Sequence, residues 1–381
     1  MNVRKIISHS TLLILIVING CLDPYAPPTI SGATNYLVVN GYLDAGDNSC
    51  TITLTRSQTL SDTGSYAAIS DAAVLIEDID GNTITLSPQG NGIYSNSNLS
   101  LNAATTYRLH IATTESNYYS DYVPVNQTPA IDSVAWGLVQ HWPGDPNVNI
   151  YVSAHGTSSQ SRYYLWNFQE TWLYTAGYPN DYKFVNRHVL PNVDTTYFCW
   201  RTLNSTSILT ASTTQLSQNI VNRFLVNTIP LNSVKLRDGY SILVNQLSVT
   251  KDAFEYWQQL KANTENLGTI FGPQPSQFSG NIHSATNPSE PVFGYFIAAS
   301  VSKKRIFIDP SLLPNPVGEV ITGFQNCPLD TLTLGGLINY NGDGAFVSAY
   351  GGLFPEGYLL TTKYCVDCRT QGGTTKKPDF W

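Results

Sequence analysis

Short runs of alternating apolar and polar residues, separated by turn-forming residues, dominate the first third of the chain. Cys50-Thr-Ile-Thr-Leu-Thr55 shows this alternation most clearly, and period two is the spacing of a strand with one buried face. Residues 73–78 and 83–86 flank an Asp-Gly pair, which favours a hairpin because that turn requires positive φ angles. With turn signals about every eight to twelve residues, residues 35–128 predict an immunoglobulin-like or transthyretin-like β-sandwich.

A second, larger β-rich domain is predicted for residues 129–381, because the proline-containing stretch 124–129 marks a boundary and further strand-like runs follow it. One helix is expected there: Thr250 is a suitable capping residue, and Phe254 and Trp257 follow at helical spacing. The predicted fold is therefore mainly β, with one or two helices in the second domain and a Cys-containing C-terminal tail. Its strand candidates are residues 131–138, 148–154, 163–174, 182–190, 240–249, 292–301 and 304–308.

The composition limits the classes of function. Only 12% of the residues are charged, about half the usual fraction, which argues against a coiled coil or a charge-driven disordered chain. Lys and Arg number 20 against 27 Asp and Glu, so the net charge is −7. A general nucleic-acid binder needs a positive surface, and we therefore expect no nucleic-acid partner.

The N-terminus resembles a bacterial lipoprotein signal peptide. Arg4 and Lys5 precede an apolar run, residues 12–18, that is too short for a transmembrane helix. Cys21 directly follows Gly20, as in a lipobox, although Asn19 departs from the usual pattern. We expect a signal peptide over residues 1–20, lipidation of Cys21, and a Pro-rich tether over residues 21–34. The alternative is an ordinary signal peptide with an incidental Cys.

The other cysteines are expected to form disulfides, because an exported protein folds in an oxidising compartment. Cys365 and Cys368 form a Cys-x-x-Cys motif, which is also found in redox pairs and half zinc sites. A structural disulfide is the preferred interpretation, either within the motif or from it to Cys327. Cys199 is a further partner or a buried thiol. With Cys50 the number is odd, so at least one thiol is expected to stay free unless it pairs with another chain.

The sequence lacks the common local signatures of catalysis. It contains no Gly-x-Ser-x-Gly, no His-Glu-x-x-His and no phosphate-binding glycine loop. We therefore expect a non-catalytic protein without a metal or cofactor, and keep a hydrolase that lacks a local motif as an alternative.

Two features are candidates for contact with a ligand or partner. Trp142 lies in a turn-like segment, and residues 268–291 form a long Pro- and Gly-rich stretch with little periodicity. That stretch is either a contact surface or a loop that covers the core. The candidate surface residues are Trp142, Phe271, Pro273, Pro275, Phe278 and His283. The apolar end of the chain, Phe380-Trp381, is expected to dock on its own domain.

Several segments together resemble one family. The most specific are Phe271-Gly-Pro-Gln-Pro-Ser276, Asn287-Pro-Ser-Glu-Pro291 and the closing Lys377-Pro-Asp-Phe-Trp381. The chain resembles the Bacteroidota outer-membrane lipoproteins known as domain of unknown function 4249, which are typically encoded beside TonB-dependent receptors. The other segments are 22–25, 36–41, 199–200, 254–261, 280–283, 292–296, 365–369 and 372–374. The resemblance implies an outer-membrane lipoprotein that is anchored by lipid, with exposure at the cell surface left open, and it carries over no catalytic residue.

The sequence therefore favours a non-catalytic accessory or binding subunit of a TonB-dependent nutrient uptake system, with the receptor as partner. Two other functions stay open: a free-standing lipoprotein that binds a glycan or peptide at the surface, and a structural subunit of an envelope complex.

Overall fold

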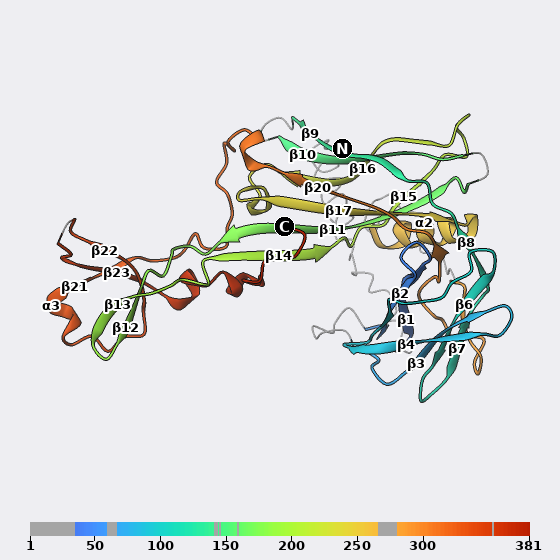
Figure 1. Ribbon diagram of the computed structural model, residues 1–381, viewed down its shortest axis with the longest axis horizontal. Helices are drawn as coiled ribbons and strands as arrows, with labels where there is room; N and C mark the ends of the chain where they lie inside the picture. Colours follow the sequence, from blue (N-terminus) through green and yellow to red (C-terminus); the bar gives the residue numbers. More distant parts are fainter. Residues whose placement is uncertain are drawn as a thin grey trace, which may run out of the picture.

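β-Strands dominate the structure, a computed structural model that describes residues 35–58, 67–140, 144, 146–157, 160–265, 280–352 and 354–381. The expected signal peptide and tether, with Cys21, lie outside the described residues. Figure 1 shows three parts: an N-terminal barrel, a central body of two sheets, and a small sheet at the far end of the molecule. The mainly β fold predicted from the sequence is confirmed.

The N-terminal part is a closed ring of eight strands, because β8 pairs with β19 on one side and with β6 on the other. The two sheets expected of a sandwich are thus joined into a barrel, whose interior is filled by apolar side chains such as Leu37, Ile52 and Ile76. In ring order the strands are β6 (Thr106–Ala112), β3 (Ala73–Asp78), β4 (Thr83–Gly90), β5 (Ile93–Asn96), β2 (Ser49–Arg56), β1 (Leu37–Asp44), β19 (Ala298–Ala299) and β8 (Val123–Asn126). β7 (Asn117–Ser120) and β18 (Ile282–Ser284) extend the sheet from β6.

The barrel is completed by a segment from much later in the chain, which we call the return segment, residues 280–299. The sequence predicts a first domain over residues 35–128, and the structure adds a later segment to it. The chain does leave the barrel after β8, but β19 returns to lie parallel to both β1 and β8. A two-residue strand whose partners are this distant leaves no local pattern in the sequence. The sequence alone therefore does not show that residues 298–299 belong to the barrel.

The return segment also has two buried faces. Val292, Phe296 and Ala298 belong to the barrel core. Ile297 and Ala299 point the other way, into an apolar cluster between the barrel and the central body. The strand predicted at 292–301 is therefore extended chain with only residues 298–299 in a ladder, and side chains on both faces hold it in place.

The central body packs two sheets face to face around the largest apolar core. Its strands alternate large side chains inward, among them Trp166, Tyr164 and Ile150. One sheet is β16 (Ile220–Pro230), β10 (Asn147–His155) and β9 (Ile131–Val139). The other is β14 (Phe198–Asn204), β11 (Tyr163–Thr175), β17 (Tyr240–Val249) and β20 (Ser302–Ile308), with β15 (Leu209–Ser212) also paired to β11. The 3-10 turns η1 (Val234–Leu236) and η2 (Pro310–Leu312) lie in its connections.

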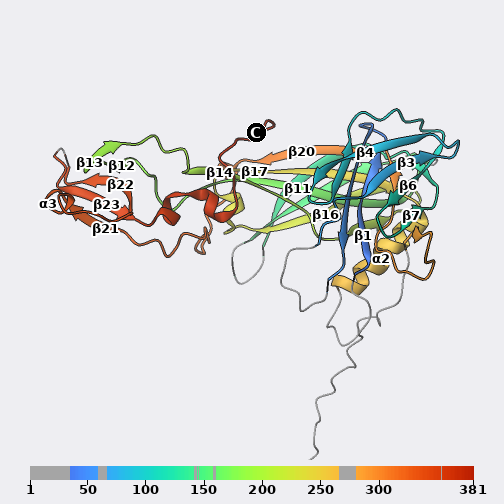
Figure 2. The ribbon, with the colours of Figure 1, turned by 90° about the horizontal axis from the view of Figure 1, so that it is seen from below.

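The predicted helix is present as α2 (Lys251–Glu265). The Thr250 hydroxyl accepts a hydrogen bond from the Ala253 backbone N–H at 3.2 Å, as expected of a capping residue. Phe254 and Trp257 pack on the cluster between the barrel and the central body, where α2 lies in Figure 2. No helix in the described ranges is long and apolar enough to cross a membrane.

A small sheet projects from the end of the central body that is remote from the barrel (Figures 1 and 2). It has five strands in the order β13 (His188–Pro191), β12 (Tyr182–Val185), β22 (Ala345–Tyr350), β23 (Gly357–Thr361) and β21 (Asp330–Thr333), with α3 (Leu334–Leu337) beside them. The single strand predicted at 182–190 is wrong, because Asn186 and Arg187 adopt positive φ angles and turn the chain into a hairpin. Such a turn is hard to predict without a glycine.

Two disulfides lie where the small sheet meets the central body, joining Cys199 to Cys368 and Cys327 to Cys365. The second is one of the pairings left open by the sequence, whereas the bond within the Cys-x-x-Cys motif does not form. Both motif cysteines fall in 3-10 turns, η3 (Lys363–Val366) and η4 (Cys368–Gln371). Cys50 is the unbonded cysteine of the described ranges, and burial in the barrel core raises the pKa of its thiol.

The fit of the return segment predicts a specific sensitivity at Gly294. This residue has a φ of +137°, and an added Cβ would lie 2.2 Å from the carbonyl oxygen of Val39. We expect Gly294→Ala to lower the free energy of unfolding by about 2 kcal/mol or more, measured by urea denaturation. Gly137→Ala, on β9 with no neighbouring atom within 4 Å, is the control and should change stability by less than about 1 kcal/mol. Equal effects of the two substitutions would contradict the close contact.

Candidate functional site

A polar cleft of about 460 Å³ lies between the outer face of the barrel and the central sheet. This volume is in the usual range of ligand sites. Most of the side chains that line it are amides or hydroxyls. They come from Asn40, Gly41, Tyr42, Asp44, Ser49, Thr51 and Thr53 of the barrel and from Asn167, Phe168, Gln169, Asn204, Ser205, Leu243, Asn245 and Lys303 of the central body.

The barrel wall of the cleft follows from the alternation of β1. Val39 and Leu43 point into the barrel core, so Asn40 and Tyr42 point outward. In the ladder with β2, Asn40 lies opposite Thr53 and Tyr42 opposite Thr51. The wall is thus a short array of cross-strand pairs whose side chains end in amide or hydroxyl groups.

The floor of the cleft follows from the alternation of β11. Trp166 and Phe168 face the core between the two sheets, which turns Asn167 and Gln169 towards the barrel. Asn167 lies opposite Asn245 of β17 in the ladder. Polar residues in the middle of a central strand would be costly against an apolar face, and here they have the cleft beside them.

The amides of the floor are linked to one another. The Asn245 side-chain N–H donates to the Asn167 side-chain oxygen at 2.7 Å, and the Gln169 amide donates to Asn204 at 3.2 Å. The Asn245 side-chain oxygen is buried and has no hydrogen-bond partner in the described part of the chain. The hydrogen-bonding capacity of the floor is therefore not used up within the protein.

An ion pair closes one end of the cleft. The Lys303 ammonium lies 2.8 Å from the carboxylate of Asp44 and also contacts Asp47. Burial opposes ionisation of Lys303, but the two carboxylates outweigh it and hold the pKa of Lys303 above its ordinary value. Asp44 is itself buried, and its Oδ1 accepts hydrogen bonds from the backbone N–H groups of Gly46 at 2.9 Å and Val301 at 3.1 Å. This end of the cleft therefore joins the β1–β2 turn to the start of β20.

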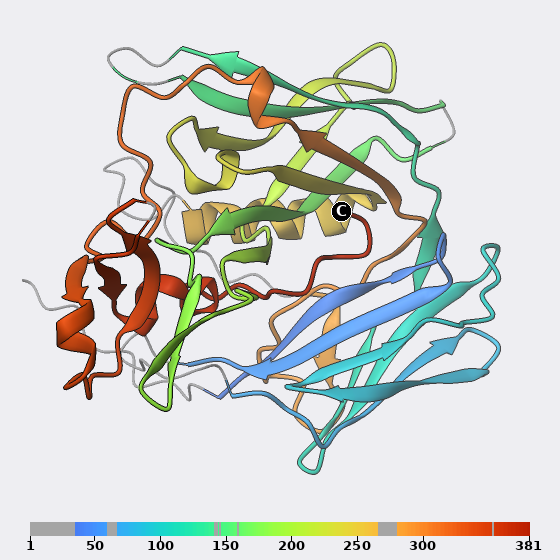
Figure 3. The same cartoon turned by 60° about the vertical axis from the view of Figure 1, so that its left-hand side comes forward.

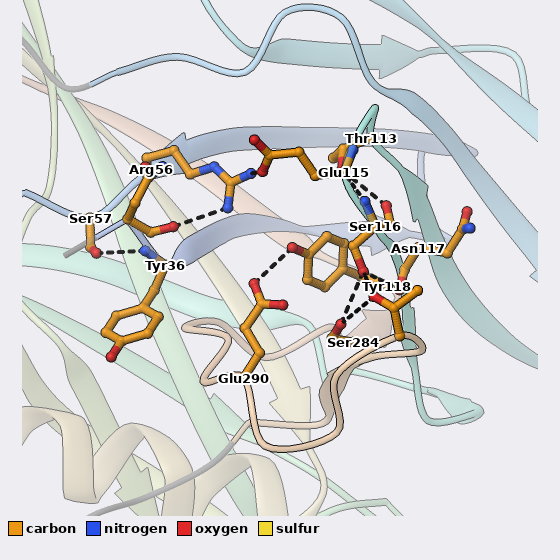
Figure 4. A network of polar contacts seen from close by, with 12 residues as sticks. Tyr36, Arg56, Ser57, Thr113, Glu115, Ser116, Asn117, Tyr118, Ser284 and Glu290 are labelled. Atoms are coloured by element: carbon orange, nitrogen blue, oxygen red, sulfur yellow. Dashed lines mark hydrogen bonds and ion pairs between the residues drawn. The ribbon is translucent and has the colours of Figure 1, made fainter. Parts of the chain in front are cut away.

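A second polar network holds the return segment to the other side of the barrel (Figure 4). The Tyr118 hydroxyl donates to Glu290 at 2.8 Å, and the hydroxyls of Ser116 and Ser284 are 3.0 Å apart. Burial, together with the Glu290 carboxylate, raises the pKa of Tyr118, which keeps its proton for this hydrogen bond. The return segment is thus attached to the barrel through Ser284 and Glu290 as well as through β19.

The arrangement is suited to binding through hydrogen bonds rather than through charge. The charged side chains that line the cleft, Asp44 and Lys303, pair with each other. Tyr42 adds an aromatic ring, and burial raises the pKa of its hydroxyl although Asn167 partly counters this. Within the described ranges no three His, Cys, Asp or Glu side chains gather to hold a metal ion.

The structure places the sequence-predicted site residues elsewhere or leaves them outside the described residues. His283, on β18, lies 3.7 Å from Asp121 and is away from the cleft strands β1 and β2. Cys327, Cys365 and Cys368 are disulfide-bonded at the junction with the small sheet. The predicted site residues that lie outside the described residues are Cys21, Trp142, Phe271, Pro273, Pro275 and Phe278.

The cleft residues were not singled out from the sequence. Asn167 and Gln169 are polar residues at alternate positions of the run 163–174, which also contains Glu170 and Thr171. Asn245 interrupts 240–249 in the same way, beside Ser241, Gln246 and Ser248. That interruption is the one signal that could have found them, because polar residues within central strands need a polar neighbour. Their spacing matches no known motif.

Comparison with known proteins assigns the chain to a family. The family described as Domain of unknown function (DUF4249) matches residues 22–305. The chain belongs to this family. The match includes every residue that lines the cleft, whereas β21, β22, β23 and the C-terminal tail lie beyond it. Among curated proteins no match is found.

The ion pair at the end of the cleft predicts unequal roles for two neighbouring carboxylates. Asp44→Ala removes the acceptor of the Val301 N–H and one partner of Lys303, so we expect it to lower the free energy of unfolding by about 2 kcal/mol or more. Asp47→Ala is the matched control: its side chain is 60% exposed, and we expect a change within about 0.5 kcal/mol. A similar small effect of both, in urea denaturation, would contradict the role given to Asp44.

Proposed function

We propose that this member of the DUF4249 family is a non-catalytic, lipid-anchored protein of the bacterial outer membrane that binds ligand as the accessory subunit of a TonB-dependent nutrient uptake system. The observation that carries the binding role is the polar cleft, which is lined by both the barrel and the central body and has an unsatisfied amide oxygen in its floor. The envelope location and the receptor partner rest on what the resemblance of the sequence segments implies.

The anchor rests on the sequence around Cys21. Lipid chains on this residue would tether the protein firmly, since each buried CH₂ contributes about 0.8 kcal/mol. The Pro-rich residues 22–34 would then act as a stiff spacer between the membrane and the barrel, which begins at β1.

The small sheet supports a protein partner. Val193, Ile338 and Phe354 are 86%, 67% and 85% exposed, respectively, and they belong to the part that projects away from the barrel (Figure 2). Exposed apolar side chains in one region favour contact with another protein. We assign this contact to the receptor, so that the cleft and the partner surface lie on different parts of the molecule.

A free-standing binding lipoprotein is the second candidate, because the cleft needs no receptor to be complete. Its binding surface is not built from tryptophans in the described ranges: none of them lines the cleft, and Trp166 and Trp172 are buried in the central core. Purification separates the two candidates.

We predict that the tagged full-length protein, purified from gently solubilised outer membranes, brings a TonB-dependent receptor with it in stoichiometric amount.

Cys21→Ala should release the protein from the membrane fraction, whereas Cys50→Ala, which removes a thiol buried in the N-terminal barrel, should leave it there. Mass spectrometry of the co-purified proteins and immunoblots of the fractions give the two readouts. Recovery of the protein alone would favour the free-standing binder, and membrane retention of Cys21→Ala would rule out the anchor.

A further inference from the structure

We propose that the cleft binds a neutral oligosaccharide, and that the chain's own C-terminal aromatic residues, Phe380 and Trp381, extend the site along the central sheet. This inference rests on the proposed binding function and adds the class of ligand. It is carried by the charge of the lining, by its hydrogen-bonding groups and by the position of the C-terminus.

The charges that line the cleft argue against anionic and cationic ligands. The protein carries a net charge of −7, yet Asp44 and Lys303 in the cleft neutralise each other at 2.8 Å. An anionic ligand would have to compete with Asp44 for Lys303, and a cationic ligand would have to displace Lys303 from Asp44. A neutral ligand leaves the pair intact.

The remaining polar groups match sugar hydroxyls. Amide and hydroxyl side chains both donate and accept hydrogen bonds, as sugar hydroxyls do. The cleft presents them on its two sides, with Asn40 and Thr51 on the barrel wall and Asn167, Gln169 and Asn204 on the floor. An extended peptide is commonly bound by an open strand edge. Here β1 is paired with β2 and β19, and β17 with β11 and β20, so these walls offer side chains rather than free backbone.

The C-terminal aromatics continue the row of side chains that crosses the floor. Gln169 lies opposite Leu243, and Leu243 lies opposite Arg305 of β20. The Arg305 guanidinium is stacked on Phe380, with its carbon 3.5 Å from the ring centroid. Directly opposed residues of neighbouring strands share one face of the sheet, so Phe380 lies on the same face as the cleft floor, two strands from Gln169.

Trp381 is fixed beside Phe380. Its ring meets Phe307 edge-on at 5.6 Å between centroids, and it approaches Gly239 so closely that an added Cβ there would lie 3.0 Å from the indole. Figure 3 shows the C-terminal tail running along the central sheet towards the barrel. The end of the chain is thus docked on its own domain, as expected, and Phe380, 38% exposed, leaves an aromatic surface on which a sugar ring can stack.

The experiment uses the detergent-solubilised full-length lipoprotein on an array of neutral oligosaccharides, anionic oligosaccharides and peptides, followed by calorimetry with the best ligand. We expect binding of a neutral oligosaccharide, weakened about tenfold by Gln169→Ala and by Phe380→Ala. Asn222→Ala, an exposed amide on β16, is the matched control and should bind as the unmodified protein does. Asn40→Ala, on the barrel wall and exposed, replaces Gln169→Ala if that variant does not fold by circular dichroism.

Binding only to anionic oligosaccharides or to peptides, binding to nothing on the array, or binding unchanged by the cleft substitutions would each overturn the ligand class. An effect of Gln169→Ala without one of Phe380→Ala would overturn the extension along the C-terminus. These failures are distinct from failure of the proposed function: a co-purifying receptor with no neutral ligand leaves the accessory role standing, and a neutral ligand with no receptor leaves the binding site standing.

Discussion

The structure depends on the insertion of Ala298 and Ala299 between β1 and β8. Two residues, parallel to both neighbours, close the ring of the barrel, and the hydrogen bonds from the Leu43 N–H to Ile297 and from the Phe293 N–H to Leu37, both 2.9 Å, continue this attachment along β1. The same stretch of chain then becomes β20 of the central sheet. The barrel cannot close without the segment that also begins a strand of its neighbour, so folding of the two parts is coupled.

This coupling explains how a cleft of fixed shape can exist between the barrel and the central body. Interfaces between domains are usually free to move, and a cleft between them would lose affinity to that motion. Here Lys303 follows β19 by only a few residues and reaches back to Asp44, while Ile297 and Ala299 fill the cluster under α2. The facing amides are therefore held in place before any ligand arrives, which is the arrangement that makes hydrogen bonds selective.

The sequence predicts the elements of this fold better than their assembly. The bounds of β3 and β17 agree with the predicted runs, and Thr250 caps α2 as expected, because periodicity and capping are local. β19 and the partner of Cys368 depend on contacts between distant residues, which leave no local pattern. The cleft was missed for a related reason: its amides come from β1, β11, β14 and β17, and only the assembled fold brings them together.

The closure of the barrel by the return segment is tested most directly by native-state hydrogen exchange, read residue by residue. The Leu43 N–H donates to the return segment, and the Phe293 N–H of the return segment donates to β1. The N–H groups of β3 report on the far side of the ring. The account predicts that the N–H groups of Leu43 and Phe293 exchange with the same opening free energy as those of β3, because the ring opens as one unit. Exchange at Leu43 and Phe293 that is orders of magnitude faster, with β3 still protected, would show that the return segment only covers a barrel that is stable without it.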